Sequence, residues 1–367
     1  MRSQNRRNPM LRASLALGAL MCAVPAAHAQ WEIKPSDDSS IKFGFLMQGR
    51  AEASDVNLSD GSQETANDLY FRRLRLLAGG KINDKLSFFF ETDSPNLGKG
   101  TASGGKTTSD IYIQDFVVTY KPGGDAFNLD VGMLLDPVTY NSNQSAISLM
   151  ATDYGPYTFA WNGPLTNNVG RDYGVRARGY VFGDRLEYRA SILQGNRGPN
   201  SSNDLRFFGR LMFNVFDAQK GLFYTGTTLG KKQLLHFGAS FDTQEDYQTF
   251  SIDGFWDQPI GDNGLTLQAA WSTLDGEDFL VPTLAEQDNL FFEGGFYFSS
   301  MKLLPFIQYA EQDFNDSSRA DQDKFIIGLG WMFSGHNGNL KLSYGQVSQD
   351  GAKDRDEFML QLQFAKF

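Results

Sequence analysis

The sequence predicts an all-β protein: a closed barrel of sixteen antiparallel strands that spans a membrane. Apolar and polar residues alternate through most of the chain, short turns alternate with long polar connectors, and the 367 residues hold no long apolar run beyond the N-terminal segment. Alternation at period two puts one kind of side chain on each face of a strand. Within a bilayer, only helices and closed barrels satisfy every backbone polar group.

The first thirty residues predict export. Four arginines and no acidic residue precede an apolar stretch at 13–24, which ends in the triplet Ala27-His28-Ala29. This is the form of a Sec-type signal peptide cleaved after Ala29. We therefore expect a signal peptide over 1–29 and a barrel domain over 30–367. The only cysteine, Cys22, lies in the signal, so we expect no disulfide and no thiolate metal site in the mature protein.

Charge and hydropathy exclude two classes of protein. Without the signal the chain has 29 basic and 43 acidic residues, because the signal holds four of the 33 Lys and Arg and none of the acids. A nucleic-acid-binding protein has the opposite balance. The mean hydropathy of −0.36 excludes a bundle of membrane helices. A barrel strand tolerates this value, because only every second residue faces lipid.

Sixteen segments carry the alternation. In the first, Ile41, Phe43, Phe45 and Met47 are separated by mostly polar residues and glycine, and Phe325-x-Ile327-x-Leu329-x-Trp331 repeats the pattern near the end. Most segments have or slightly exceed the 9–11 residues that a tilted strand needs to cross a bilayer. The predicted strands are 41–52, 69–82, 84–93, 109–121, 126–135, 169–182, 184–195, 204–217, 233–243, 246–257, 264–274, 288–299, 301–312, 323–333, 338–348 and 356–367.

The connectors predict which ends of the strands share a side of the membrane. Short turns rich in Gly, Asn and Asp, residues that tolerate positive φ, alternate with long polar connectors. Transmembrane barrels have short periplasmic turns and long outer loops. The long connectors are 53–68, 94–108, 136–168, 275–287, 313–322 and 349–355. Two connectors break the rule: 243–245 is short where a long loop is due, and 217–232 is long where a turn is due.

The polar faces of the strands are predicted to line the barrel interior. A row of arginines there would select anions, because it lowers the barrier that an anion meets on leaving water. Alternatively, these cations pair with interior acids such as Glu52, Glu91, Glu187 and Glu293 and merely hydrate the wall. Arg72 has the opposite parity and is expected to face lipid and snorkel. The predicted pore-lining or solute-binding residues are Arg50, Arg73, Arg75, Arg176, Arg178, Arg189, Arg206, Arg210, Lys324 and Lys341.

Several short motifs resemble one family. They are Tyr70-Phe71-Arg72-Arg73-Leu74-Arg75-Leu76, Ile111-Tyr112-Ile113-Gln114-Asp115, Val131-Gly132-Met133 and Arg171-Asp172-Tyr173-Gly174-Val175. On these motifs, the chain resembles the phosphate-selective porin O and P family, and the resemblance covers most of the mature chain. The resemblance implies a sixteen-stranded, homotrimeric porin in the outer membrane of a Gram-negative bacterium. It also implies that the third outer loop, about 136–168 here, folds inward and constricts the pore.

The expected constriction loop lacks the positive charges of a phosphate-binding site. A phosphate site needs cationic groups, and residues 136–168 contain no Lys or Arg. The sequence therefore does not predict a narrow specificity for phosphate. The residues that we expect to shape the constriction are Asp136, Tyr140, Asp153, Tyr154, Tyr157 and Trp161.

These features predict a porin for passive diffusion of small hydrophilic solutes, with a preference for anions. The alternative is a structural or adhesive surface barrel with a closed lumen, in which the acidic outer loops carry the function. In both cases we expect outer-membrane lipid and lipopolysaccharide as partners, and no nucleic acid. We expect no enzyme, cofactor or metal, because His236 and His336 are the only histidines beyond the signal and no sequence pattern marks a catalytic or ligating partner.

Overall fold

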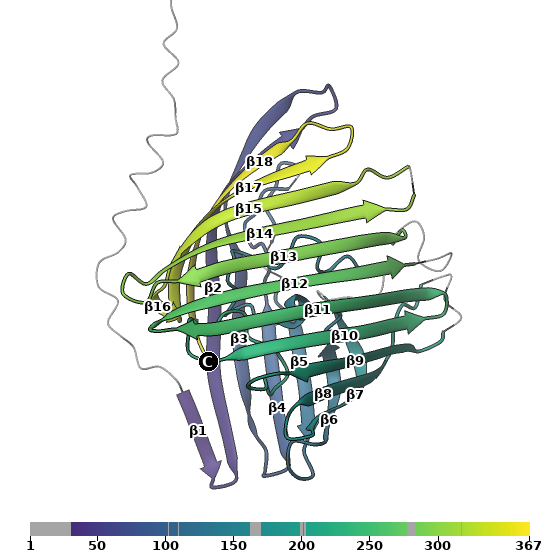
Figure 1. Ribbon diagram of the computed structural model, residues 1–367, viewed down its shortest axis with the longest axis vertical. Helices are drawn as coiled ribbons and strands as arrows, with labels where there is room; N and C mark the ends of the chain where they lie inside the picture. Colours follow the sequence, from purple (N-terminus) through teal and green to yellow (C-terminus); the bar gives the residue numbers. More distant parts are fainter. Residues whose placement is uncertain are drawn as a thin grey trace, which may run out of the picture.

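The computed structural model describes residues 31–367 apart from 102, 109, 162–169, 199–200, 202, 277–283 and 317, so the predicted signal peptide lies outside the described residues. All described strands except β16 (Phe333–His336) form one antiparallel sheet of 17 strands, in which β1 (Trp31–Ser36) pairs with the start of β2. The other sixteen close into a barrel (Figure 1), because β18 pairs with β2 from Glu357–Ser54 to Lys366–Phe45. The barrel strands are β2 (Ser39–Asn57), β3 (Gln63–Lys81), β4 (Leu86–Asp93), β5 (Tyr112–Tyr120), β6 (Asn128–Leu135), β7 (Arg171–Val181), β8 (Leu186–Leu193), β9 (Arg206–Asn214), β10 (Leu234–Gln244), β11 (Tyr247–Ile260), β12 (Asn263–Asp275), β13 (Gln287–Tyr297), β14 (Leu303–Phe314), β15 (Gln322–Trp331), β17 (Gly338–Gln349) and β18 (Arg355–Lys366).

The predicted closed barrel is confirmed, and each of the sixteen predicted segments overlaps one barrel strand. The largest boundary error is the predicted connector 53–68. Most of it is strand, because β2 continues to Asn57 and β3 begins at Gln63. Residues 63–67 are exposed on both faces, so neither face selects apolar residues and no alternation marks the strand. The short strands β1 and β16 (Phe333–His336) were not predicted either.

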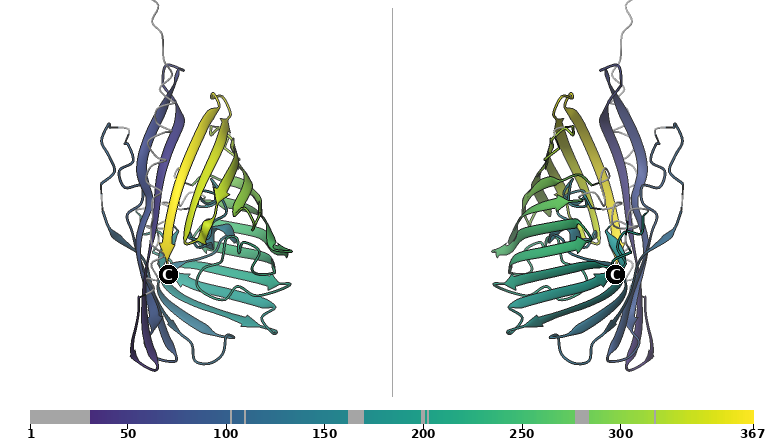
Figure 2. Two further views of the ribbon diagram at one scale, coloured as in Figure 1. Left: turned by 90° about the vertical axis from the view of Figure 1, so that its left-hand side faces the viewer. Right: turned by 90° about the vertical axis from the view of Figure 1, so that its right-hand side faces the viewer.

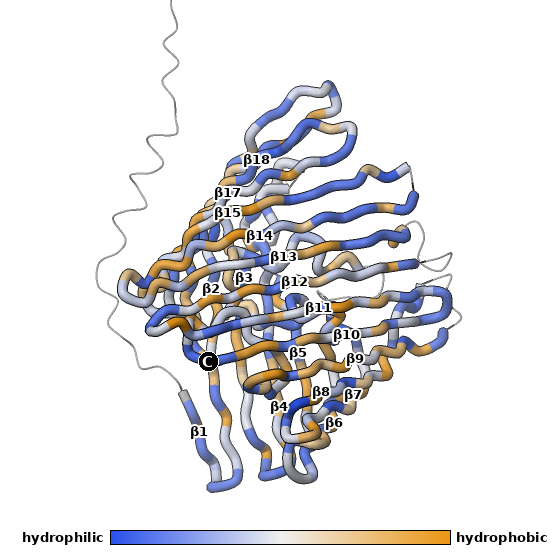
Figure 3. Tube along the Cα trace, in the orientation of Figure 1, coloured by the Kyte–Doolittle hydropathy of each residue, from blue (hydrophilic) through white to orange (hydrophobic). Residues whose placement is uncertain are grey.

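Apolar side chains cover the outside of the barrel. Leu76, Ile327 and Leu342 are each more than half exposed, whereas arginines at inward positions are buried. Figure 3 shows the resulting alternation of apolar and polar residues along the strands. This distribution is the reverse of a soluble sandwich and fits an apolar outer band in contact with lipid. In the described part of the chain, no helix has both the length and the apolar character needed to cross a membrane.

Two connectors fold into the barrel instead of remaining at its rims. One follows β6 and includes a 3-10 turn, η2 (Asn141–Asn143); the other joins β9 to β10. The side views in Figure 2 show chain segments between the walls of the barrel. Buried apolar side chains therefore cluster inside it; in one cluster Val138 and Trp161 of the first connector pack with Leu274 of β12.

Candidate functional site

The connector that begins at Asp136 crosses the lumen and is fastened to its walls. The carbonyl oxygen of Val138 accepts hydrogen bonds from Ser240 of β10, at 2.6 Å, and Ser251 of β11. Farther along, the carbonyl oxygens of Leu149 and Ala151 accept from the Lys341 ammonium group of β17, at 2.6 and 2.9 Å. The described part of this connector, 136–161, is therefore held by strands far apart around the barrel. We call it the lumen loop.

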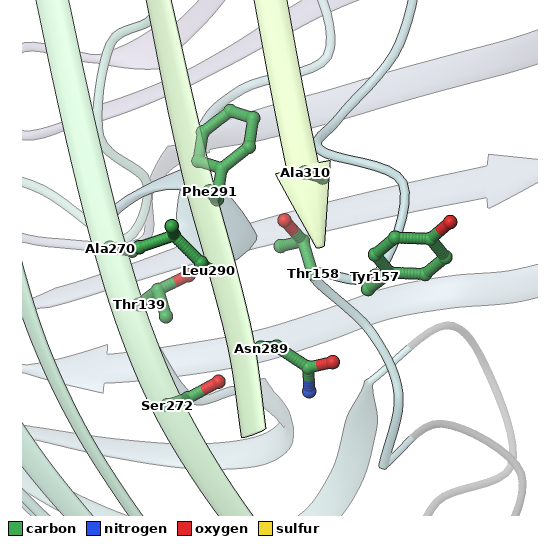
Figure 4. Close-up of a pocket in the computed structure, with 9 residues that line it drawn as sticks. All are labelled: Thr139, Tyr157, Thr158, Ala270, Ser272, Asn289, Leu290, Phe291 and Ala310. Atoms are coloured by element: carbon green, nitrogen blue, oxygen red, sulfur yellow. The ribbon is translucent and has the colours of Figure 1, made fainter. Parts of the chain in front are cut away.

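Aromatic residues of the lumen loop pack against the wall. Tyr140 lies between Phe255 and Tyr224, with ring centroids 4.3 and 4.6 Å away. The Tyr154 hydroxyl donates to the carbonyl oxygen of Gln144 at 2.8 Å. Tyr157 lies beside a cavity of about 20 Å³ against β12, β13 and β14 (Figure 4), which has room for a single water. Burial raises the pKa of Tyr157 to about 12, so its hydroxyl stays neutral.

Two acidic residues of the lumen loop bind wall arginines. Asp136 accepts from Arg176 at 3.2 Å and from the Ser191 hydroxyl at 2.9 Å. Asp153 accepts from three arginines: Arg50 of β2 at 3.2 Å, and Arg72 and Arg73 of β3 at 2.7 and 2.6 Å. We call Asp153 and these three arginines the arginine node.

The arginine node keeps Asp153 ionised. Burial opposes ionisation, but the charges of Arg72, Arg73 and Arg50 outweigh it and hold the pKa of Asp153 well below its usual range. The other partners of Arg50 are the Gln361 side chain and the carbonyl oxygen of Thr152, and both are neutral. Asp153 is therefore the one carboxylate among the described contacts of these arginines.

The expectation that Arg72 faces lipid is wrong. In the pairing of β2 with β3, Gln48 lies opposite Arg73 and Gly49 lies opposite Phe71, so Arg72 is the extra residue of a β-bulge. A bulge re-aims side chains because two residues oppose one. Here it lets the Arg72 guanidinium reach Asp153 in the lumen, next to Arg73. Parity alone could not reveal this, since one inserted residue changes the face of its neighbours.

A second bulge lies on the same wall. Glu91 of β4 pairs with Asp115 of β5, and Thr92 pairs with Ile113, so Gln114 is the extra residue. Gln114 and Asp115 are both buried as a result. Asp115 binds Arg171 at 3.0 Å. Neither residue of this ion pair was among the predicted pore-lining residues, although the resemblance motifs contain both.

Except for Lys341, which binds the carbonyl oxygens of Leu149 and Ala151, the other predicted pore-lining cations lie beside carboxylates. Arg75 binds Glu91 at 2.7 Å and Asp93 at 2.9 Å. The remaining ion pairs are Arg176 and Arg178 with Asp130, Arg189 with Glu187, Arg206 with Asp172 and Asp242, Arg210 with Asp253, and Lys324 with Glu357. Of the acids expected to neutralise the wall, Glu52 binds Lys99 at 2.8 Å, and Glu293 accepts from the Gln268 and Gln308 side chains.

The unusually long connector between β9 and β10 supports the lumen loop. The backbone N–H of Tyr224 donates to Asn143 at 3.0 Å, and its carbonyl oxygen accepts from the N–H of Ser145 at 2.8 Å. The Tyr224 ring stacks on Tyr140, and the Arg189 guanidinium lies 4.6 Å from its centroid. The length of this connector was visible in the sequence, but its partner was not, because neither segment has a regular pattern.

We expect Tyr224→Ala to destabilise the protein by about 3–5 kcal/mol, as for other buried aromatic side chains cut to alanine. The Tyr224→Phe variant is the matched control, because it keeps the stack with Tyr140 and loses only the hydrogen bond to Glu187, 3.0 Å long. Urea unfolding of the protein in phospholipid vesicles measures both. Equal losses in the two variants would show that the stacked ring does not hold the loop.

The two histidines lie in separate surroundings. His236 stacks with Tyr140 and Phe255 inside the barrel. His336 lies 2.8 Å from the carbonyl oxygen of Thr227. Among the residues that the structure describes, no three His, Cys, Asp or Glu side chains are arranged to hold a metal ion.

A closed sixteen-stranded barrel, apolar outside and crossed inside by a loop bound to charged walls, defines a channel of the porin class. The family model for phosphate-selective porin O and P matches residues 45–257, which is more than half of the chain. The chain belongs to this family. It is an outer-membrane channel of a Gram-negative bacterium rather than an enzyme.

Solved structures with the same fold have little sequence in common with this chain. An anion-selective porin from Comamonas acidovorans superposes with a TM-score of 0.59 at 11% identity, over 90% of this chain and 100% of that one. OmpF of Salmonella typhi, in complex with daunomycin, gives 0.58 at 15%, over 91% and 100%. The outer membrane channel DcaP of Acinetobacter baumannii gives 0.58 at 13%, over 91% and 99%. A comparison with curated proteins gave no match.

Proposed function

We propose that this protein is a passive diffusion pore for small hydrophilic solutes with a preference for anions. The arginine node supports the preference, because three cations share one carboxylate where the lumen loop meets the wall. The Lys341 ammonium group binds the same stretch of loop through two carbonyl oxygens. Fixed positive charge at a narrow point favours anions.

The rest of the wall supports a modest preference only. Each of the other predicted pore-lining cations has a carboxylate within 3.4 Å. A paired arginine offers a passing anion little net charge. The node is therefore the place where selectivity should arise.

Recordings of the purified protein in planar bilayers test the proposal. We expect stepwise conductance increases, and a reversal potential in a salt gradient that lies on the anion side. The apolar clusters inside the barrel favour the alternative, a surface barrel with a closed lumen. Silence at every voltage would support that alternative and contradict a diffusion pore.

We do not expect the pore to be narrowly specific for phosphate. Residues 136–161 of the lumen loop carry no Lys or Arg, and the node arginines already bind Asp153. At constant ionic strength, adding millimolar phosphate to a chloride solution should leave the chloride current unchanged. A current that saturates or is blocked by phosphate at these concentrations would reveal a dedicated phosphate site.

Two further parts of the proposal rest on the sequence and the resemblance. We propose a homotrimer, which chemical cross-linking in outer-membrane preparations would detect as a species of three chains. We also propose that residues 1–29 are removed by signal peptidase, so the mature protein should begin at Gln30.

A further inference from the structure

We propose that Asp153 and the bulge residue Arg72 set the charge selectivity of the pore, in opposite directions. This inference rests on the proposed function, because it names the residues that tune it. Arg72 adds positive charge where the lumen loop meets the wall, and Asp153 neutralises part of that charge. The sequence predicted Asp153 among the residues that shape the constriction, whereas it predicted that Arg72 faces lipid.

The contacts of the arginine node give it a net positive charge. The guanidinium groups of Arg50, Arg72 and Arg73 converge on Asp153 within 3.2 Å. Besides Asp153, Arg73 has one other described hydrogen-bond partner, the side-chain oxygen of Gln48 at 2.8 Å. With three cations and one anion, the node carries a net charge of about +2. The other predicted pore-lining arginines meet at least as many carboxylates; Arg75, for example, has Glu91 and Asp93.

The β-bulge brings Arg72 into the lumen. On either side of it, β3 alternates normally: Tyr70 and Arg73 are buried and Phe71 is exposed. Deleting Arg72 would place Phe71 next to Arg73 and leave these residues facing as they do now. The bulge therefore adds a third cation to the lumen without altering the rest of the wall.

Asp153→Asn is the first experimental change. It keeps the size of the side chain but raises the net charge of the node from about +2 to +3. We expect the reversal potential in a salt gradient to shift toward the anion limit. The shift should be large at 0.1 M salt, where the Debye length is about 10 Å, and smaller at 1 M, where it is about 3 Å.

Two controls separate charge from damage. Asp153→Glu keeps the charge, so we expect it to keep the reversal potential near that of the unaltered protein. Asp60→Asn removes the same charge from an outer turn, where Asp60 accepts from the N–H of Ser62 at 2.9 Å. It should leave the selectivity unchanged.

Removal of Arg72 is the second change. Deleting Arg72, or replacing it by Gln, should shift the reversal potential toward cations. Arg72→Lys should retain the anion preference. Deleting Gln114 removes the other bulge without a change in charge, so it should not produce the cation shift.

The outcomes distinguish this inference from the proposed function. Absence of current from the unaltered protein would contradict the pore itself. Current with an unchanged reversal potential in Asp153→Asn, or a higher conductance without a change in selectivity, would overturn the role of Asp153 in selectivity and leave the pore intact. If Asp153→Asn does not assemble, the Arg72 variants decide: no cation shift in either the deletion or Arg72→Gln overturns the inference.

Discussion

Asp130→Asn is expected to destabilise the barrel by about 3–5 kcal/mol, the usual cost of removing one partner from a buried ion pair. Asp130 is fully buried and accepts from Arg176 at 2.9 Å and Arg178 at 2.7 Å. The Thr119 hydroxyl donates to its other oxygen at 2.7 Å. Asparagine offers one acceptor oxygen and no charge, so two buried guanidinium groups lose their shared counter-ion. Urea unfolding in phospholipid vesicles measures the loss.

A second variant tests whether the loss of stability comes from buried arginines that have lost their counter-ion. Arg178→Gln removes one of the two cations, so the double variant with Asp130→Asn should be less destabilised than the two single losses added together. Asp262→Asn, in the exposed turn between β11 and β12, should stay within about 0.5 kcal/mol of the unaltered protein. Strict additivity of Asp130→Asn and Arg178→Gln would show that the two side chains are not coupled.

Alternation predicted the barrel because lipid and lumen impose opposite demands on successive residues. Within the apolar band this signal is strong, as at Phe325, Ile327 and Leu329, which are all exposed. It fades where β2 and β3 extend beyond that band, since water contacts both faces there. The fold was therefore predictable wherever the two faces differ.

The candidate site was less predictable because it depends on contacts between distant segments. Parity placed Arg50 and Arg73 on the correct face, but their shared partner, Asp153, lies 103 and 80 residues away along the chain. The fold, not a motif, brings Asp153 to them. The resemblance supplied the expectation that the loop folds inward, but not its anchors.

The bulges show a second limit. A β-bulge inserts one residue, and the alternation of residues in Tyr70-Phe71-Arg72-Arg73 does not by itself distinguish a bulge from a regular strand. Two adjacent arginines in a predicted membrane strand are the one available signal, since Arg72 on the lipid face would be costly. That cost argues for a re-aimed side chain wherever a strand carries consecutive charges.

Leu342→Arg is expected to cost about 2–4 kcal/mol, because it would place a charge near the middle of the outer apolar band. Leu342 lies on β17 between Leu329 of β15 and Leu360 of β18, and 55% of its surface is exposed. In a soluble protein, an arginine at so exposed a position would change stability by less than about 0.5 kcal/mol. The stability cost of the substitution therefore shows whether this face contacts lipid or water.

Met301→Arg is the matched control. Met301 is exposed to the same degree, 54%, but lies in the short turn between β13 and β14, at one end of the barrel. Near a membrane interface the same charge should cost only about 0–1 kcal/mol. Unfolding of both variants in phospholipid vesicles gives the difference. Equal costs at the two positions would mean that the apolar band does not face lipid.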